Sequence, residues 1–162
     1  MTGRVVDDVG EFAALLPRAG ALMGLDLGTK TIGVAVSDTG RVIASPLETI
    51  RRTRFGADAA ALMALAGPRR IAGLVLGLPR NMDGSEGPRA QSTRAFARNL
   101  AGLTELPMTF WDERLSTVAA ERALIEADAS RRRRAEVVDH VAAGYILQGL
   151  LDRLGHLARE SR

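Results

Sequence analysis

Short apolar runs, separated by glycine, proline and charged residues, alternate with longer alanine- and leucine-rich runs along the chain. The short runs are rich in β-branched and aliphatic residues and predict strands, whereas the longer runs predict helices. The predicted strands are 21–27, 32–38, 41–50, 71–78 and 107–112. The predicted helices are 9–16, 58–66, 89–101, 116–127 and 135–154, with a charged loop at 128–134 before the last.

The order of these elements predicts an α/β fold. After the short first helix the order is β-β-β-α-β-α-β-α-α, in which an antiparallel meander precedes alternating helices and strands. Right-handed crossovers would then place helices on both faces of one five-stranded mixed sheet. Pro46 cannot donate a ladder hydrogen bond, so the third strand is predicted to be an edge strand or broken. The run 71–78 is apolar throughout, as in a strand buried on both faces.

The length of 162 residues fits one domain. We expect a domain over 21–155, preceded by an appendage at 1–20 and followed by a tail at 156–162. No apolar run approaches the roughly 20 residues of a membrane span, and the acidic residues near the start do not suit a secretory signal. The chain has no cysteine, which fits a reducing compartment. A cytoplasmic protein without membrane contact is expected.

Arginine dominates the basic residues. Lysine and arginine together number 22, yet Lys30 is the single lysine, and the net charge is only +3. Arginine binds phosphate bidentately and would suit a nucleic-acid partner. A general compositional preference for arginine explains the bias equally well, so composition alone leaves the partner open.

The segment 22–37, LMGLDLGTKTIGVAVS, is the most informative stretch. Two predicted strands flank a tight turn, and Asp26 lies at the end of the first strand. A carboxylate at the end of a buried strand is costly unless it is hydrogen-bonded or bound to a metal. The glycines of the turn would let a ligand approach the backbone. By itself this segment fits either a phosphate cradle or a metal ligand.

Two further acidic residues occur where predicted buried elements end or are interrupted. Glu113 follows the strand at 107–112, and Asp139 lies in an otherwise largely apolar part of the last helix. Taken singly, each acid could be a helix cap or a solvated charge. If the sheet gathers all three at one end, their charges would repel unless a cation offsets them. Mg²⁺ or Mn²⁺ is the cation expected for an all-oxygen site.

Four segments in series resemble the YqgF/RuvX family of bacterial nucleases, which are related to the RuvC Holliday-junction resolvase. They are 22–37, 77–90 (GLPRNMDGSEGPRA), 111–117 (WDERLST) and 137–143 (VVDHVAA). The resemblance covers about 21–152 and implies a ribonuclease H-like fold. It also implies an endonuclease with Mg²⁺ or Mn²⁺, two ions in all, in which Asp26, Glu113 and Asp139 are the catalytic metal ligands.

The resemblance further implies a substrate, a partner and a setting. The family is associated with maturation of the 5′ end of 16S ribosomal RNA, so the expected substrate is pre-rRNA, free or in a ribosomal precursor particle. The alternative is resolution of four-way DNA junctions, which would favour a symmetric homodimer over a monomer because two strands are cut.

Several basic residues are candidates for nucleic-acid binding. Lys30 lies in the turn after Asp26, Arg89 follows a loop rich in turn-forming residues, and Arg114 follows Glu113. The remaining candidates form an arginine run before the last helix: Arg131, Arg132, Arg133 and Arg134. Such a run would bind the phosphate backbone without reading sequence, although a solvated charge run is the competing interpretation. Trp111 and Tyr145 are expected in the core.

Two other function classes compete with the nuclease. An actin-like ATPase opens with a similar Asp-x-Gly turn, but it needs two such domains and a glycine-rich adenosine loop, for which 162 residues are too few. A catalytically inert nucleic-acid-binding regulator is the second, and the presence of all three acids argues against it.

Overall fold

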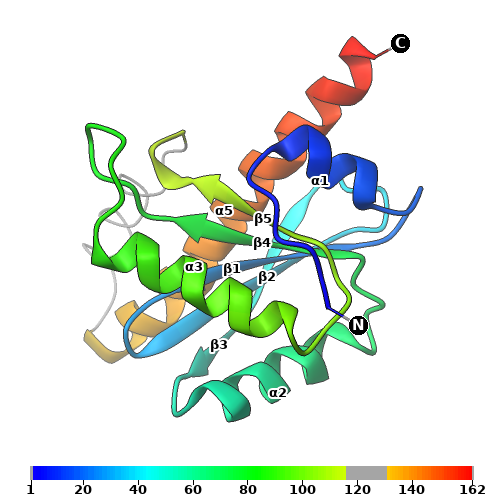
Figure 1. The fold of residues 1–162 in the computed structure, drawn as a ribbon. Helices are drawn as coiled ribbons and strands as arrows, with labels where there is room; N and C mark the ends of the chain where they lie inside the picture. The colour runs from blue at the N-terminus through cyan, green and yellow to red at the C-terminus, as the bar shows by residue number, and fades with distance from the viewer. Residues whose placement is uncertain (1, 116–130, 162) are drawn as a thin grey trace.

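A mixed sheet of five strands lies between two helical layers in the computed structural model, which describes residues 2–115 and 131–161 and, within 131–139, the backbone alone (Figure 1). The strand order is β3-β2-β1-β4-β5. The strands are β1 (Leu22–Leu27), β2 (Thr31–Ser37), β3 (Ala44–Arg51), β4 (Gly73–Leu78) and β5 (Met108–Asp112). The helices are α1 (Val9–Leu15), α2 (Phe55–Ala66), α3 (Pro88–Ala101), the 3₁₀ turn η1 (Glu113–Leu115) and α5 (Arg131–Glu160).

The pairing of the strands confirms the predicted meander. β1 pairs antiparallel with β2 and β2 antiparallel with β3, whereas β4 runs parallel to both β1 and β5. β3 is an edge strand, as Pro46 predicted, and the register shifts opposite it between Val34 and Ala35. β4 is buried at every position, as its continuous apolar run predicted.

Alternate residues of the central strands belong to two separate cores. Met23, Leu25 and Leu27 of β1 pack in a core with residues of α2 and α3. Leu22 packs in a second core with residues of α1 and α5. Because side chains alternate along a strand, Gly24 and Asp26 share the second face with Leu22. The sheet therefore has an α5 face and an α2/α3 face.

The N-terminal segment, which the sequence predicted as an appendage, contacts the rest of the fold. The amide of Gly3 donates to the carbonyl of Ala101, and Val5 forms a parallel bridge with Met108. Phe12 of α1 is completely buried beneath the sheet's α5 face. These contacts join residues far apart in the chain, so no local pattern could have revealed them.

The last helix is longer than its apolar pattern predicted. It begins at Arg131 rather than near residue 135, so the arginine run is helical and not a loop. It also continues through the expected tail to Glu160. Arginine has a high helix propensity, so the charge run does not interrupt the helix. The predicted helix at 116–127 and the loop residues 128–130 lie outside the described residues.

The described helices include none that is both long enough and apolar enough to cross a membrane.

Candidate active site

Asp26 is the last residue but one of β1 and is buried, with only 3% of its surface exposed. It pairs with Gly33 of β2, and its side chain belongs to the α5 face of the sheet. A buried carboxylate needs hydrogen bonds or a positive charge to offset the loss of hydration. Asp26 therefore lies where a cation or a set of donors is required.

Glu113 follows β5 in the turn η1, and its carboxylate reaches back over the sheet. A Cβ atom built on Gly77 of β4 would lie only 2.7 Å from Oε1 of Glu113. Leu25 pairs with Leu76, so the next residues, Asp26 and Gly77, are neighbours across the two strands. The absence of a side chain at Gly77 thus gives the Glu113 carboxylate its place beside the Asp26 strand.

Asp139 lies in the first part of α5, and its side chain is outside the described residues. The next residue, His140, is hydrogen-bonded through Nδ1 to the Thr49 hydroxyl at 3.0 Å. Thr49 pairs with Gly33, which pairs with Asp26, so these three residues form one row across the sheet. The helix backbone next to Asp139 therefore lies at the level of Asp26.

Asp26 and Glu113 could supply oxygen ligands to a divalent cation. Both belong to the α5 side at the same end of the sheet, and two like charges so placed repel unless a cation lies between them. The part of the chain that the structure describes holds no group of three or more histidine, cysteine, aspartate or glutamate side chains suited to a metal. That finding covers these two acids and does not reach the Asp139 side chain.

The turn after Asp26 is narrow. The Gly28 amide donates to the Thr31 carbonyl at 2.8 Å, and the Lys30 carbonyl accepts from the Arg52 amide. The side chains of Thr29 and Lys30 are exposed to solvent. The turn itself is thus held by backbone hydrogen bonds, and Lys30 stays a predicted phosphate contact.

Arg114 is paired with Asp112, the last residue of β5. Its Nε and Nη2 donate to Asp112 at 3.1 and 2.7 Å, and Nη1 donates to the Met82 carbonyl at 3.4 Å. The hydrogen bonds from Arg114 hold the pKa of Asp112 below its usual value. Arg114 therefore links the end of β5 to the loop at 79–87, and its role in nucleic-acid binding stays a prediction.

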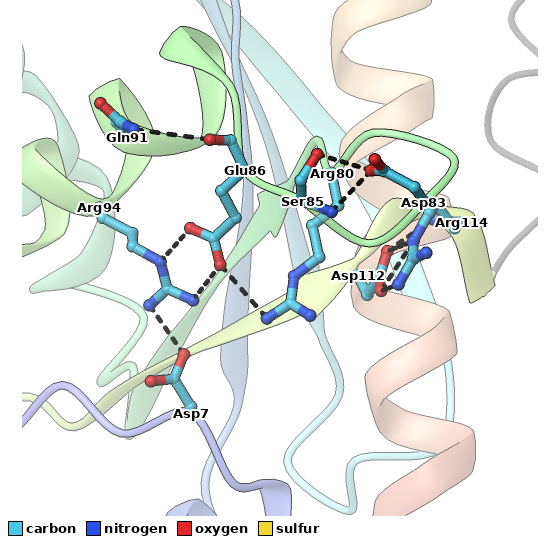
Figure 2. A network of polar contacts seen from close by, with 9 residues as sticks. All are labelled: Asp7, Arg80, Asp83, Ser85, Glu86, Gln91, Arg94, Asp112 and Arg114. Carbon is cyan, nitrogen blue, oxygen red and sulfur yellow. Dashed lines mark hydrogen bonds and ion pairs between the residues drawn. The ribbon is translucent and has the colours of Figure 1, made fainter.

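The same loop is fixed at its other end by a second arginine (Figure 2). Arg94 of α3 donates to Glu86 through Nε at 2.6 Å and Nη2 at 2.8 Å, and to Asp7 through Nη1 at 2.8 Å. Arg80 lies 3.4 Å from Glu86. The hydrogen bonds from Arg94, and then the positive charges of Arg94 and Arg80, lower the pKa of Glu86. The loop beside the site is thereby joined to α3 and to the N-terminal segment.

Arg89 lies at the start of α3, and its Nη2 donates to the Leu27 carbonyl at 3.3 Å. It belongs to a cleft that also contains Arg52 and Arg54, which the sequence analysis did not single out. The arginine-rich stretch 51–54 is the sequence feature that could have indicated these two residues. The side chains of Arg131 to Arg134 lie outside the described residues. Trp111 is buried against Gly149, which confirms its expected place in the core. Tyr145 is 37% exposed, so the prediction that it lies in the core is wrong.

A family model described as "RuvX: Holliday junction resolvase" matches residues 20–153. The chain belongs to the RuvX family. It is 76% identical over 149 residues to a protein of Rhodobacter capsulatus, covering 92% of the chain and 94% of the relative. It is 72% identical over 155 residues to a protein of Paracoccus denitrificans, covering 96% and 98%. Both relatives carry the name "Putative pre-16S rRNA nuclease".

Solved structures identify the fold of this RuvX chain. Thermus thermophilus RuvC in complex with a Holliday junction substrate matches with a TM-score of 0.54 at 13% identity, covering 84% of the chain and 96% of that protein. A second Thermus thermophilus RuvC structure matches with a TM-score of 0.51 at 16% identity, covering 83% and 96%. At such low identity the likeness concerns the fold alone, and it confirms the expected ribonuclease H-like architecture.

Proposed function

We propose that this RuvX protein is a divalent-metal-dependent endonuclease that hydrolyses phosphodiester bonds in the maturation of the 5′ end of pre-16S rRNA. The proposal rests on one observation. The Asp26 carboxylate is buried in β1, and the Glu113 carboxylate lies over Gly77 of the neighbouring strand β4. The names of its relatives support the substrate. A ribosomal precursor as substrate would place the reaction in the cytoplasm.

The residues present fit a divalent cation. Asp26 and Glu113 offer oxygen ligands on one face of the sheet, and Gly77 leaves the space that Glu113 occupies. With Asp139 from α5, they would hold Mg²⁺ or Mn²⁺, two ions in the form that the family resemblance implies. Bound there, such ions would activate water and stabilise the leaving 3′ oxygen.

The chain itself would position the substrate phosphate. Burial in β1 fixes the Asp26 carboxylate, and the hydrogen bonds of the following turn fix the backbone at Gly28. Gly28 carries no side chain to block a phosphate. Glu113 is held at the end of β5, so its carboxylate approaches from a second strand. His140 and Thr49 anchor α5 at the row of Asp26.

Resolution of DNA junctions is the second candidate, favoured by the description of the family as a Holliday junction resolvase. Ribonuclease H-like carboxylate sites cleave RNA and DNA alike, and contacts to the 2′-hydroxyl decide between them. The chain would cut a junction as a homodimer, because two strands are cleaved.

A side-by-side cleavage assay separates the two candidates. A 16S rRNA precursor with a 5′ extension and a four-way DNA junction are each incubated with the protein and Mg²⁺ or Mn²⁺, with a chelator control. Cleavage of the precursor at its 5′ side and not of the junction is the expected result. Cleavage of the junction alone would replace the rRNA assignment, and cleavage that survives chelation would contradict the metal site.

A further inference from the structure

A polar cleft of about 380 Å³ opens on the α2/α3 side of the sheet, at the same end as Asp26. It lies between the β1–β2 turn, the start of α2 and the first turns of α3. We name it the arginine cleft after Arg52, Arg54 and Arg89, which line it together with the hydroxyl-bearing Thr29 and Ser92. The predicted carboxylate site does not use it.

The arginine cleft has a net positive charge. One carboxylate, Asp58, lines it against three guanidinium groups. Asp58 accepts the Thr53 amide at 3.0 Å and lies 3.8 Å from Nε of Arg52. Arg54 and Arg89 form no ion pair with any residue in the described ranges 2–115 and 140–161. Within those ranges, no ion pair offsets the positive charges of Arg54 and Arg89 at the cleft.

Two of the three arginines, Arg52 and Arg89, are held in place by the fold. Arg52 donates through Nη1 to the Gly28 carbonyl at 2.6 Å, and its guanidinium lies over the Phe96 ring at 5.6 Å. Arg89 is bonded to the Leu27 carbonyl. Guanidinium groups that are already oriented lose less side-chain entropy when they bind a planar or tetrahedral anion. These features favour a phosphate group as the ligand.

The size and position of the arginine cleft indicate that the phosphate belongs to a nucleic-acid strand. A water molecule occupies roughly 30 Å³, so the cleft has room for a phosphate together with its sugar. Leu27, Gly28 and Thr29 line it and directly follow Asp26 in the chain. Two residues span at most about 7 Å. A strand that crosses the β1–β2 turn could thus reach Asp26 on one face and the cleft on the other.

We propose that the arginine cleft binds a phosphate of the substrate strand that lies a short distance from the cleaved bond. This inference rests on the proposed function, because it takes the strand at Asp26 as its source of phosphate. The contact is to the backbone, so it positions the strand and does not select its sequence.

Binding of a labelled RNA oligonucleotide tests the proposal. The intact chain is compared with Arg54→Gln and Arg89→Gln in a chelating buffer, where cleavage cannot interfere and no assignment of the metal ligands is needed. Each variant is expected to weaken binding by about three- to tenfold and to reduce the slope of log K against log salt by about 0.7. Arg54→Lys keeps the charge and is expected to bind like the parent chain.

Arg98→Gln is the matched control, because Arg98 is exposed on the same helix, nine residues from Arg89. It should leave affinity and slope unchanged. Equal affinity and slope in the parent, Arg54→Gln and Arg89→Gln, with folding verified by thermal melting, would overturn the proposal. It would do so without affecting the nuclease assignment, which is judged by cleavage.

A competition arm identifies the source of the phosphate. Adenosine monophosphate is titrated into the parent chain and into Arg54→Gln. Weak binding that does not displace the oligonucleotide at millimolar concentration supports a strand phosphate. Tight binding of the mononucleotide that Arg54→Gln abolishes, with oligonucleotide affinity unchanged, would show a site for free nucleotides and overturn the proposal.

Discussion

At the residue scale, Gly77 determines whether the Glu113 carboxylate can approach the sheet. The space of a Cβ atom at this position is taken by Oε1 of Glu113 at 2.7 Å and by the side chain of Ile146. A distance below 3 Å forces a neighbour to move. Glycine therefore suits this position by its small size, because a Cβ atom would displace the ends of the Glu113 and Ile146 side chains, and not by its backbone φ, which is not positive.

The substitution Gly77→Ala is predicted to displace Glu113 and to lower the cleavage rate on the order of 100-fold, as expected for a misplacement of about 1 Å. Overpacking against Ile146 should also lower the free energy of unfolding by about 1–3 kcal/mol. Rates under single-turnover conditions and urea unfolding measure the two effects.

Gly73→Ala is the matched control for this prediction. Gly73 lies in the same strand and faces Phe12 and Leu16, so its Cβ would be similarly crowded without touching a carboxylate. Comparable loss of stability with nearly normal cleavage is expected. If both variants lose cleavage equally, the effect of Gly77→Ala is one of stability and Glu113 is not positioned by Gly77.

At the element scale, the loop at 79–87 is held beside the candidate site by charged contacts. Glu86 receives two hydrogen bonds from Arg94, and Arg94 also lies over the Phe110 ring at 4.8 Å. The pKa of Glu86 is lowered from its usual value of 4.5. A lowered pKa in the folded state means that the pair stabilises the fold above the unfolded-state pKa.

This contribution is predicted to disappear as the pH falls below about 4.5 through the lowered pKa of Glu86. Arg94→Gln should therefore lower the free energy of unfolding at pH 7. It should also make the free energy of unfolding fall less steeply as the pH is lowered. The packing of Arg94 on Phe110 does not depend on pH in this range, so the slope reports the ion pairs of Arg94 with Glu86 and Asp7. Urea unfolding between pH 3 and 7 measures it. An unchanged slope relative to Arg98→Gln would contradict the role of Glu86.

The N-terminal segment is the second element with a measurable role. Phe12 of α1 is completely buried, and Phe12→Ala is predicted to lower the free energy of unfolding by about 3–5 kcal/mol. Val9→Ala, at a partly buried position of the same helix, should cost less. A cost below 1 kcal/mol for Phe12→Ala would favour the predicted appendage at residues 1–20 and contradict a structural role of α1.

At the scale of the whole molecule, the two faces of one sheet carry different chemistry. The α5 face holds the buried Asp26 and the Glu113 carboxylate, and the α2/α3 face holds the arginine cleft. Both lie where β1 ends. A nucleic-acid strand could therefore contact the proposed metal ligands and the arginines of the cleft at one end of the molecule.

The sequence predicted the sheet well, because each strand is an apolar run bounded by glycine, proline or charge. The position of Pro46 even located the edge strand. Contacts between distant residues were not predictable: the approach of Glu113 to Gly77 depends on the register of β4 and β5, and the burial of Phe12 depends on the pairing of Val5 with Met108. Arg52 and Arg54 were missed because a solvated loop and a folded cleft have the same local pattern.

The substitution Asp26→Asn tests whether Asp26 is a catalytic carboxylate that binds the metal. The variant keeps nearly the same size and is compared with the parent chain for cleavage of the 16S rRNA precursor in Mg²⁺ and for binding of the same RNA. Cleavage is expected to fall below detection while the RNA is still bound. Metal-dependent cleavage at the parent rate by Asp26→Asn would contradict this role of Asp26.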